Sequence, residues 1–115
     1  MRIHLEDVDD EDPYDPDRYW YRGAPYTGDV YATNASGAVI EEFSVRNGVV
    51  HGVERSWYGD GTPKTEVRVD RGRAIGTARY WHPNGRPAEE RDFDDRGRIV
   101  ARRRWTDDGT PLPDD

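Results

Sequence analysis

Glycine and tryptophan recur in this chain with a fixed step of 24 residues. Four glycines and three tryptophans make up the series, each tryptophan four residues before a glycine: Gly37, Gly61, Gly85 and Gly109, with Trp57, Trp81 and Trp105. A period of about 20 to 50 residues is typical of proteins in which one supersecondary unit is copied and stacked. The sequence therefore predicts a tandem array, and we expect its function to lie on a surface rather than in an enclosed pocket.

The period divides the chain into two parts. We assign residues 1–18 to an acidic N-terminal arm and residues 19–115 to the array, with units near 21–46, 47–70, 71–95 and 96–113. The first unit has Thr33 at the position that tryptophan holds in the others. Terminal units of such arrays are often atypical because they cap the stack.

Each unit has the local pattern of a β-hairpin. In the third unit, Pro83 and Asn84 suit the central positions of a type I turn, and Gly85 supplies the left-handed residue of a three-residue loop. This loop length predicts Trp81 opposite Pro87 and Tyr80 opposite Ala88. We therefore predict an all-β fold, in which tandem hairpins form one elongated, twisted antiparallel sheet.

Because strand residues alternate between faces, the same register predicts which residues lie together. One face is expected to be packed and to include the tryptophans, several apolar residues and a row of arginines: Trp57, Trp81, Trp105, Val45, Val67, Val69 and Phe93, with Arg55, Arg79 and Arg103. The arginine stems would lie along the indole rings while their charged ends reach water or neighbouring acids.

The opposite face carries the candidate binding residues of the array. Tyrosines and glutamates are predicted there, three of the glutamates in a row at the repeat spacing: Glu54, Tyr58 and Tyr80, with Glu42, Glu66 and Glu90. The face is either an ordinary solvated surface or a recognition surface, in which tyrosines anchor a basic partner and glutamates meet its lysines and arginines.

Residues 1–17 hold eight acidic side chains and one arginine, so the formal net charge of −7 resides in this arm. The arm is either a solubilising segment or an anionic segment that enters a basic cleft of a partner. Its candidate binding residues are Asp7, Asp9, Asp10, Glu11 and Asp12. Free DNA or RNA would be repelled by this charge, so we expect no direct nucleic-acid partner.

Other function classes find little support in the sequence. The chain has no cysteine and lacks the G-x-S-x-G and phosphate-loop motifs. Its three histidines occupy unrelated positions, and paired acids such as Glu89 and Glu90 point to opposite faces of a strand. We expect no enzyme activity, no cofactor and no metal site. No apolar run approaches the length of a membrane span, so we expect no membrane partner and a cytoplasmic protein.

The motifs Tyr21 to Gly28, Asn47 to Gly52, Trp57 to Gly61 and Trp81 to Gly85 resemble, taken together, the MORN-repeat variant of YwqK-type bacterial antitoxins. The likeness spans roughly residues 19–112. It implies a row of antiparallel hairpins and a role as the immunity partner of a toxin, often one with a nuclease or deaminase domain. We therefore expect an immunity protein that occludes a basic active-site cleft of its toxin. The alternative is a MORN-type scaffold that organises other proteins or touches a membrane surface.

Overall fold

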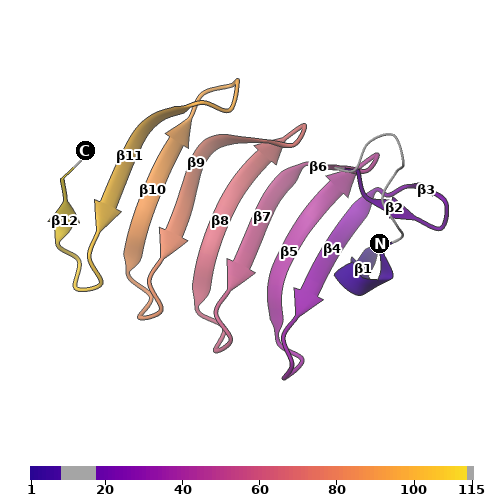
Figure 1. The fold of residues 1–115 in the computed structure, drawn as a ribbon, viewed down its shortest axis with the longest axis horizontal. Coiled ribbons are helices and arrows are strands. Elements are labelled where there is room, and N and C mark those ends of the chain that lie inside the picture. Colours follow the sequence, from indigo (N-terminus) through magenta and orange to yellow (C-terminus); the bar gives the residue numbers. More distant parts are fainter. Residues whose placement is uncertain (9–17, 114–115) are drawn as a thin grey trace.

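The computed structural model describes residues 1–8 and 18–113, most of which belong to one elongated β-sheet (Figure 1). The molecule measures 49 × 37 × 20 Å, and the described residues contain no α-helix. Seven strands run antiparallel in chain order: β4 (Gly28–Thr33), β5 (Val39–Arg46), β7 (Gly52–Trp57), β8 (Pro63–Asp70), β9 (Arg73–Trp81), β10 (Pro87–Phe93) and β11 (Ile99–Trp105). The prediction of an all-β fold with one elongated, mostly antiparallel sheet is confirmed.

Short elements lie at the two ends of the sheet and at one turn. Near the N-terminus, β1 pairs in parallel with β4 and is followed by the 3-10 helix η1, while β2 and β3 form a separate two-stranded ribbon. The strand β6 pairs with the end of β5, and β12 pairs with the end of β11. Their bounds are β1 (Arg2–His4), η1 (Leu5–Asp7), β2 (Trp20–Tyr21), β3 (Ala24–Pro25), β6 (Val49–Val50) and β12 (Pro111–Leu112).

The hairpin loops have the predicted geometry. His82 N donates to Arg86 O at 2.8 Å, and Gly85 N donates to His82 O at 2.9 Å, which closes a three-residue loop. Gly85 has φ = 89°, a left-handed conformation that side-chain-bearing residues rarely adopt. The same pair of hydrogen bonds closes the loops within 34–38, 58–62 and 106–110. Turn chemistry therefore predicted the loop length correctly.

In the first three hairpins the predicted register holds for the pair next to the loop and then fails, whereas β12 keeps it at both of its pairs with β11. Trp81 lies opposite Pro87, as expected, but Tyr80 lies opposite Glu89 and not opposite Ala88. A β-bulge between Pro87 and Glu89 inserts one residue into β10, and similar irregularities follow the loops before β5 and β8. Because side chains alternate with a period of two, one inserted residue moves the rest of the strand to the other face.

The predicted packed stripe is therefore wrong in one respect: its valines and its arginines occupy opposite faces of the sheet. Val67 lies opposite Glu54, whereas Arg55 lies opposite Glu66. We name the two faces after their contents. The core face carries Val30, Phe43, Val45, Glu54, Val67 and Val69, and the ladder face carries Glu42, Arg55, Glu66, Arg79, Glu90 and Arg103.

The most buried part of the protein lies at the N-terminal end of the core face. Five residues form this cluster, against which four partly buried side chains pack (Val8, Tyr19, Tyr21 and Val50): Ile3, Tyr26, Val30, Phe43 and Val45. Gly28 is required here, because a Cβ at this position would come within 2.5 Å of the Tyr26 hydroxyl. The three periodic tryptophans are only partly buried, so the centre of the core lies elsewhere than the sequence predicted.

Candidate functional site

The predicted glutamate row lies on the ladder face, where each glutamate has arginine neighbours. Across successive strands Glu42, Arg55, Glu66, Arg79, Glu90 and Arg103 lie directly opposite one another in this order. Arg55 approaches Glu66 at 3.7 Å, and Arg79 approaches Glu90 at 3.7 Å. Arg103 contacts Glu90 and Asp92, each at 3.1 Å.

At the N-terminal end, Arg2 extends the ladder. Its guanidinium lies 3.3 Å from Glu42 and 4.2 Å above the ring of Tyr31. Exposed ion pairs contribute little singly, but opposite charges directly across a sheet favour this register. The row of Glu42, Glu66 and Glu90 is therefore neutralised by the protein itself and offers little net charge to a partner.

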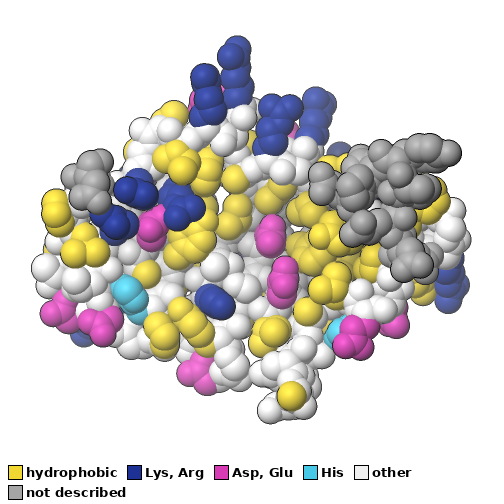
Figure 2. Space-filling view, viewed as in Figure 1, with side chains coloured by type: hydrophobic (Ala, Val, Ile, Leu, Met, Phe, Trp, Pro, Cys, Tyr) yellow, Lys and Arg dark blue, Asp and Glu magenta, His cyan; other side chains and the backbone are white. Residues whose placement is uncertain are grey.

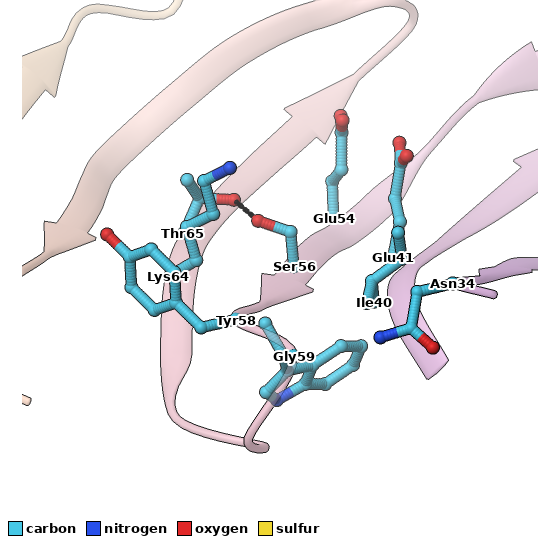
Figure 3. Close-up of a pocket in the computed structure, with 10 residues that line it drawn as sticks. Asn34, Ile40, Glu41, Glu54, Ser56, Tyr58, Gly59, Lys64 and Thr65 are labelled. Carbon is cyan, nitrogen blue, oxygen red and sulfur yellow. Dashed lines mark hydrogen bonds between the residues drawn. The ribbon is translucent and has the colours of Figure 1, made fainter. Parts of the chain in front are cut away.

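Glu54 occupies a different environment, an open hollow on the core face (Figure 3). The hollow has a volume of about 580 Å³ and is formed by β5, β7, β8 and the loop between β7 and β8. Glu41 and Glu54 line it from adjacent strands and extend in the same direction in Figure 3, and Trp57, Tyr58 and Lys64 line it as well. Acidic, aromatic and aliphatic surface thus meet in one concave site.

The local structure fixes the walls of the hollow. Ser56 and Thr65 face each other on β7 and β8, and their hydroxyl groups are 2.5 Å apart. The Tyr58 hydroxyl donates to the carbonyl oxygen of Trp81 at 2.7 Å, which ties the rim to the next hairpin. The Lys64 ammonium lies 5.6 Å from the centre of the Tyr58 ring. Both tyrosine contacts limit the mobility of the rim.

The electrostatics of the hollow favour binding of a cationic group. Burial raises the pKa of Glu54, and the negative charge of Glu41 raises it further. Neither carboxylate forms an ion pair with another described residue. In Figure 2, acidic side chains lie among hydrophobic ones in the middle of this face.

The other predicted binding residues are dispersed. Tyr80 lies on the core face opposite Thr65, and the guanidinium of Arg91 lies 5.1 Å from its ring centre. Asp7 is exposed in η1, at the N-terminal end of the sheet. Four further candidates lie outside the described residues: Asp9, Asp10, Glu11 and Asp12. The structure therefore brings Glu54 and Tyr58 together and separates them from Glu42, Glu66 and Glu90.

Sequence reasoning missed Glu41, Trp57 and Lys64 as residues of the hollow. Glu41 could have been identified from the alternating charges of the ladder face. A register that places Arg55 opposite Glu42 on one neighbouring strand and opposite Glu66 on the other also places Glu41 opposite Ser56. Trp57 was expected on the packed face, and Lys64 is the residue that the bulge in β8 leaves without a partner across the strand pair.

Three further observations bear on the class of protein. Among residues 1–8 and 18–113, no group of three or more histidine, aspartate and glutamate side chains is placed to hold a metal ion. In the same ranges, no helix has the length and apolar character needed to cross a bilayer. Comparisons with protein families, with curated proteins and with solved structures gave no match to this chain.

Proposed function

We propose that this protein is an immunity protein, which binds a toxin with a basic active-site cleft and blocks access to that cleft. The observation that carries the proposal is the hollow of Glu41 and Glu54, two carboxylates without a described cationic partner beside an indole and a phenol ring. A lysine or arginine side chain from the toxin would neutralise the carboxylates and stack on the rings.

The energetics favour an anchor at this place. Glu54 is already partly desolvated, so the free protein bears part of the cost of removing its carboxylate from water. A cation that enters the hollow recovers this cost and gains an ion pair in a poorly solvated setting. Interface anchors are commonly buried aromatic and arginine groups at the centre of the contact.

The rest of the molecule provides a rigid support for the hollow. The ladder face links strands from β5 to β11 by alternating charges, and the loop contacts between Tyr58 and Trp81 and between His82 and Trp105 join successive hairpins. A preorganised surface loses less conformational entropy on binding. Loops closed in this way recur at the sequence period, within 34–38, 58–62, 82–86 and 106–110, and this recurrence agrees with tandem repeats of MORN type, which the resemblance of the motifs implies.

The mechanism is steric and electrostatic and needs no chemistry by the immunity protein itself. Enzymes that act on nucleic acids carry basic clefts, so the core face would cover the substrate path while the hollow holds one basic side chain. The acidic arm, which includes Asp7, would speed the encounter through long-range attraction. The arm would therefore act mainly on the rate of association, and the hollow mainly on the strength of the complex.

The test is an affinity capture from the native host with three forms of the protein. The first is the wild type, the second is the Glu41→Gln/Glu54→Gln variant of the hollow, and the third is a matched control, Glu42→Gln/Glu66→Gln, on the ladder face. We expect one basic protein to be captured by the wild type and the control but weakly by the hollow variant.

The captured protein must also prove toxic. Its expression alone should stop growth of a heterologous bacterium, and co-expression of wild-type immunity protein should restore growth. A captured protein without toxicity contradicts the immunity function, and capture that is equal for all three forms contradicts the assignment of the hollow.

A further inference from the structure

The two ends of the sheet differ in how far a further strand covers the edge. At the N-terminal end, β1 covers the edge of β4 through three residue pairs, from Arg2 with Asp29 to His4 with Tyr31. At the other end, β12 pairs with β11 only at Arg104 and Trp105. Within the part of the chain that the structure describes, residues 99–103 of β11 have no strand on their outer side. Such an edge offers unpaired backbone N–H and C=O groups to another strand.

The side chains at this edge are also exposed. Ile99 retains 54% of its accessible surface and Val100 retains 65%, the second-largest value, after Met1, among the exposed large hydrophobic residues. Both lie at the end of β11 that β12 does not reach. Long exposed edges are normally protected by charge or by a covering segment, and here protection by charge is uneven along the strand.

Arg102 is the exception in the charge pattern of β11. Arg103 is paired with Glu90 and Asp92, whereas Arg102 lies directly opposite Arg91 on the neighbouring strand. Arg91 itself contacts Glu89. No described carboxylate pairs with Arg102, and like charges opposite each other destabilise a sheet. Figure 2 shows Lys and Arg side chains gathered over this end of the core face.

We propose that the outer edge of β11 binds an extended acidic segment of a partner protein, which adds a strand to the sheet. Its backbone would pair with residues 99–103, an aliphatic side chain would cover Ile99 or Val100, and a carboxylate would lie beside Arg102. Strand addition takes affinity from main-chain hydrogen bonds and specificity from alternate side chains. The site is separate from the hollow at Glu54 and does not depend on the proposed function.

Charge decides between an acidic segment and a second copy of this chain. A second β11 paired antiparallel over residues 99–103 would set Arg102 of each copy opposite Val100 of the other and would supply no carboxylate to Arg102. A nucleic acid would satisfy Arg102 but would leave the carbonyl groups of the edge and the aliphatic surface of Val100 unpartnered. An acidic peptide satisfies the charges, the backbone and the apolar surface together.

The probe is an end-blocked heptapeptide of alternating valine and glutamate, titrated into isotope-labelled protein and followed by backbone NMR. We expect shift changes and slower amide exchange confined to residues 99–103. The matching peptide with lysine in place of glutamate, and a single-stranded oligonucleotide, serve as the comparison ligands. Equal response to the lysine peptide, a preference for the oligonucleotide, or changes on other strands would overturn the proposal.

Two variants of Arg102 and one remote control variant separate binding from folding. Arg102→Glu should weaken binding of the acidic peptide about tenfold or more through like-charge repulsion, yet it replaces an arginine pair by an attractive pair with Arg91 and should unfold no earlier than the wild type. Arg102→Lys should retain binding. Arg46→Glu, on exposed Arg46 of β5, is the remote control and should bind as the wild type does. Retention of binding by Arg102→Glu would contradict the proposed edge.

Discussion

The carboxylates of Glu41 and Glu54 enter the same hollow from neighbouring strands, and the charge of Glu41 adds to the burial that raises the pKa of Glu54 (Figure 3). Their arrangement costs stability in the free protein, because two like charges share a partly desolvated site. Residues kept at a cost to folding are common where a protein binds a partner.

Glu54→Gln should stabilise the free protein at neutral pH. A raised pKa means that the folded state binds protons more readily than the unfolded state, so stability falls as pH rises from the ordinary carboxyl pKa through the raised value. The gain should be at most about 1 kcal/mol, because the carboxyl remains partly solvated. Thermal unfolding between pH 4 and pH 8 should show a weaker pH dependence in the variant; Glu66→Gln, which removes a partner of Arg55, should give no such gain.

Phe43→Ala should destabilise the protein more than Trp81→Ala does. Phe43 retains 5% of its accessible surface within the buried cluster, whereas Trp81 is only partly buried. We expect a loss of about 3 to 5 kcal/mol for Phe43→Ala and a smaller loss for Trp81→Ala. Urea unfolding of both variants measures the difference. The reverse order would show that the tryptophans, as the sequence alone suggests, carry the core.

The register illustrates how far the sequence determines the fold. Turn chemistry predicted three-residue loops and the opposition of Trp57 to Pro63 and of Trp81 to Pro87, and all of these are observed. Glycine at the left-handed position is a local requirement, so a local signal is enough to identify it. The fold class followed from the same information.

The bulges could not be read from loop length, and they decided which face each side chain occupies. One inserted residue after Pro63 sets Arg55 against Glu66 and places Val67 with Glu54. A cross-strand comparison of charges would have favoured this register, since the unbulged one puts arginines and valines on one face. The hollow was therefore only partly predictable: Glu54 and Tyr58 were identified as candidates, whereas Glu41, Trp57 and Lys64 depend on the bulged register.

Asp108 should titrate at a pKa of about 2. Hydrogen bonds from the side chains of Thr106 and Thr110, together with the backbone N–H of Thr110, stabilise its charged form. A lowered pKa contributes stability that is present above the unfolded value, about 4, and is lost as pH falls toward 2. NMR titration of the carboxyl, with exchange of the Thr110 amide, measures this. An ordinary pKa for Asp108, or an Asp108→Asn variant with unchanged acid sensitivity of this loop, would contradict the loop geometry.

Neutralising the acidic arm should slow association with the captured toxin and leave dissociation nearly unchanged. Long-range attraction acts on the encounter rate and is screened by salt, so the variant should also lose most of the salt dependence of association. The substitutions are Asp to Asn and Glu to Gln at Asp7, Asp9, Asp10, Glu11 and Asp12. Stopped-flow measurement of the association rate at two ionic strengths tests this prediction. Unchanged rates would leave the arm a solubilising segment only.

The most direct test of the account is the affinity of the captured toxin for two double variants, measured by calorimetry at one salt concentration. Removal of the two carboxylate charges of the hollow in Glu41→Gln/Glu54→Gln should weaken binding by roughly a hundredfold, through faster dissociation. The control Glu42→Gln/Glu66→Gln, which changes the charge equally on the ladder face, should bind within about threefold of the wild type. Unchanged affinity in the first variant, with a large loss in the second, would place the toxin on the ladder face and contradict the central claim.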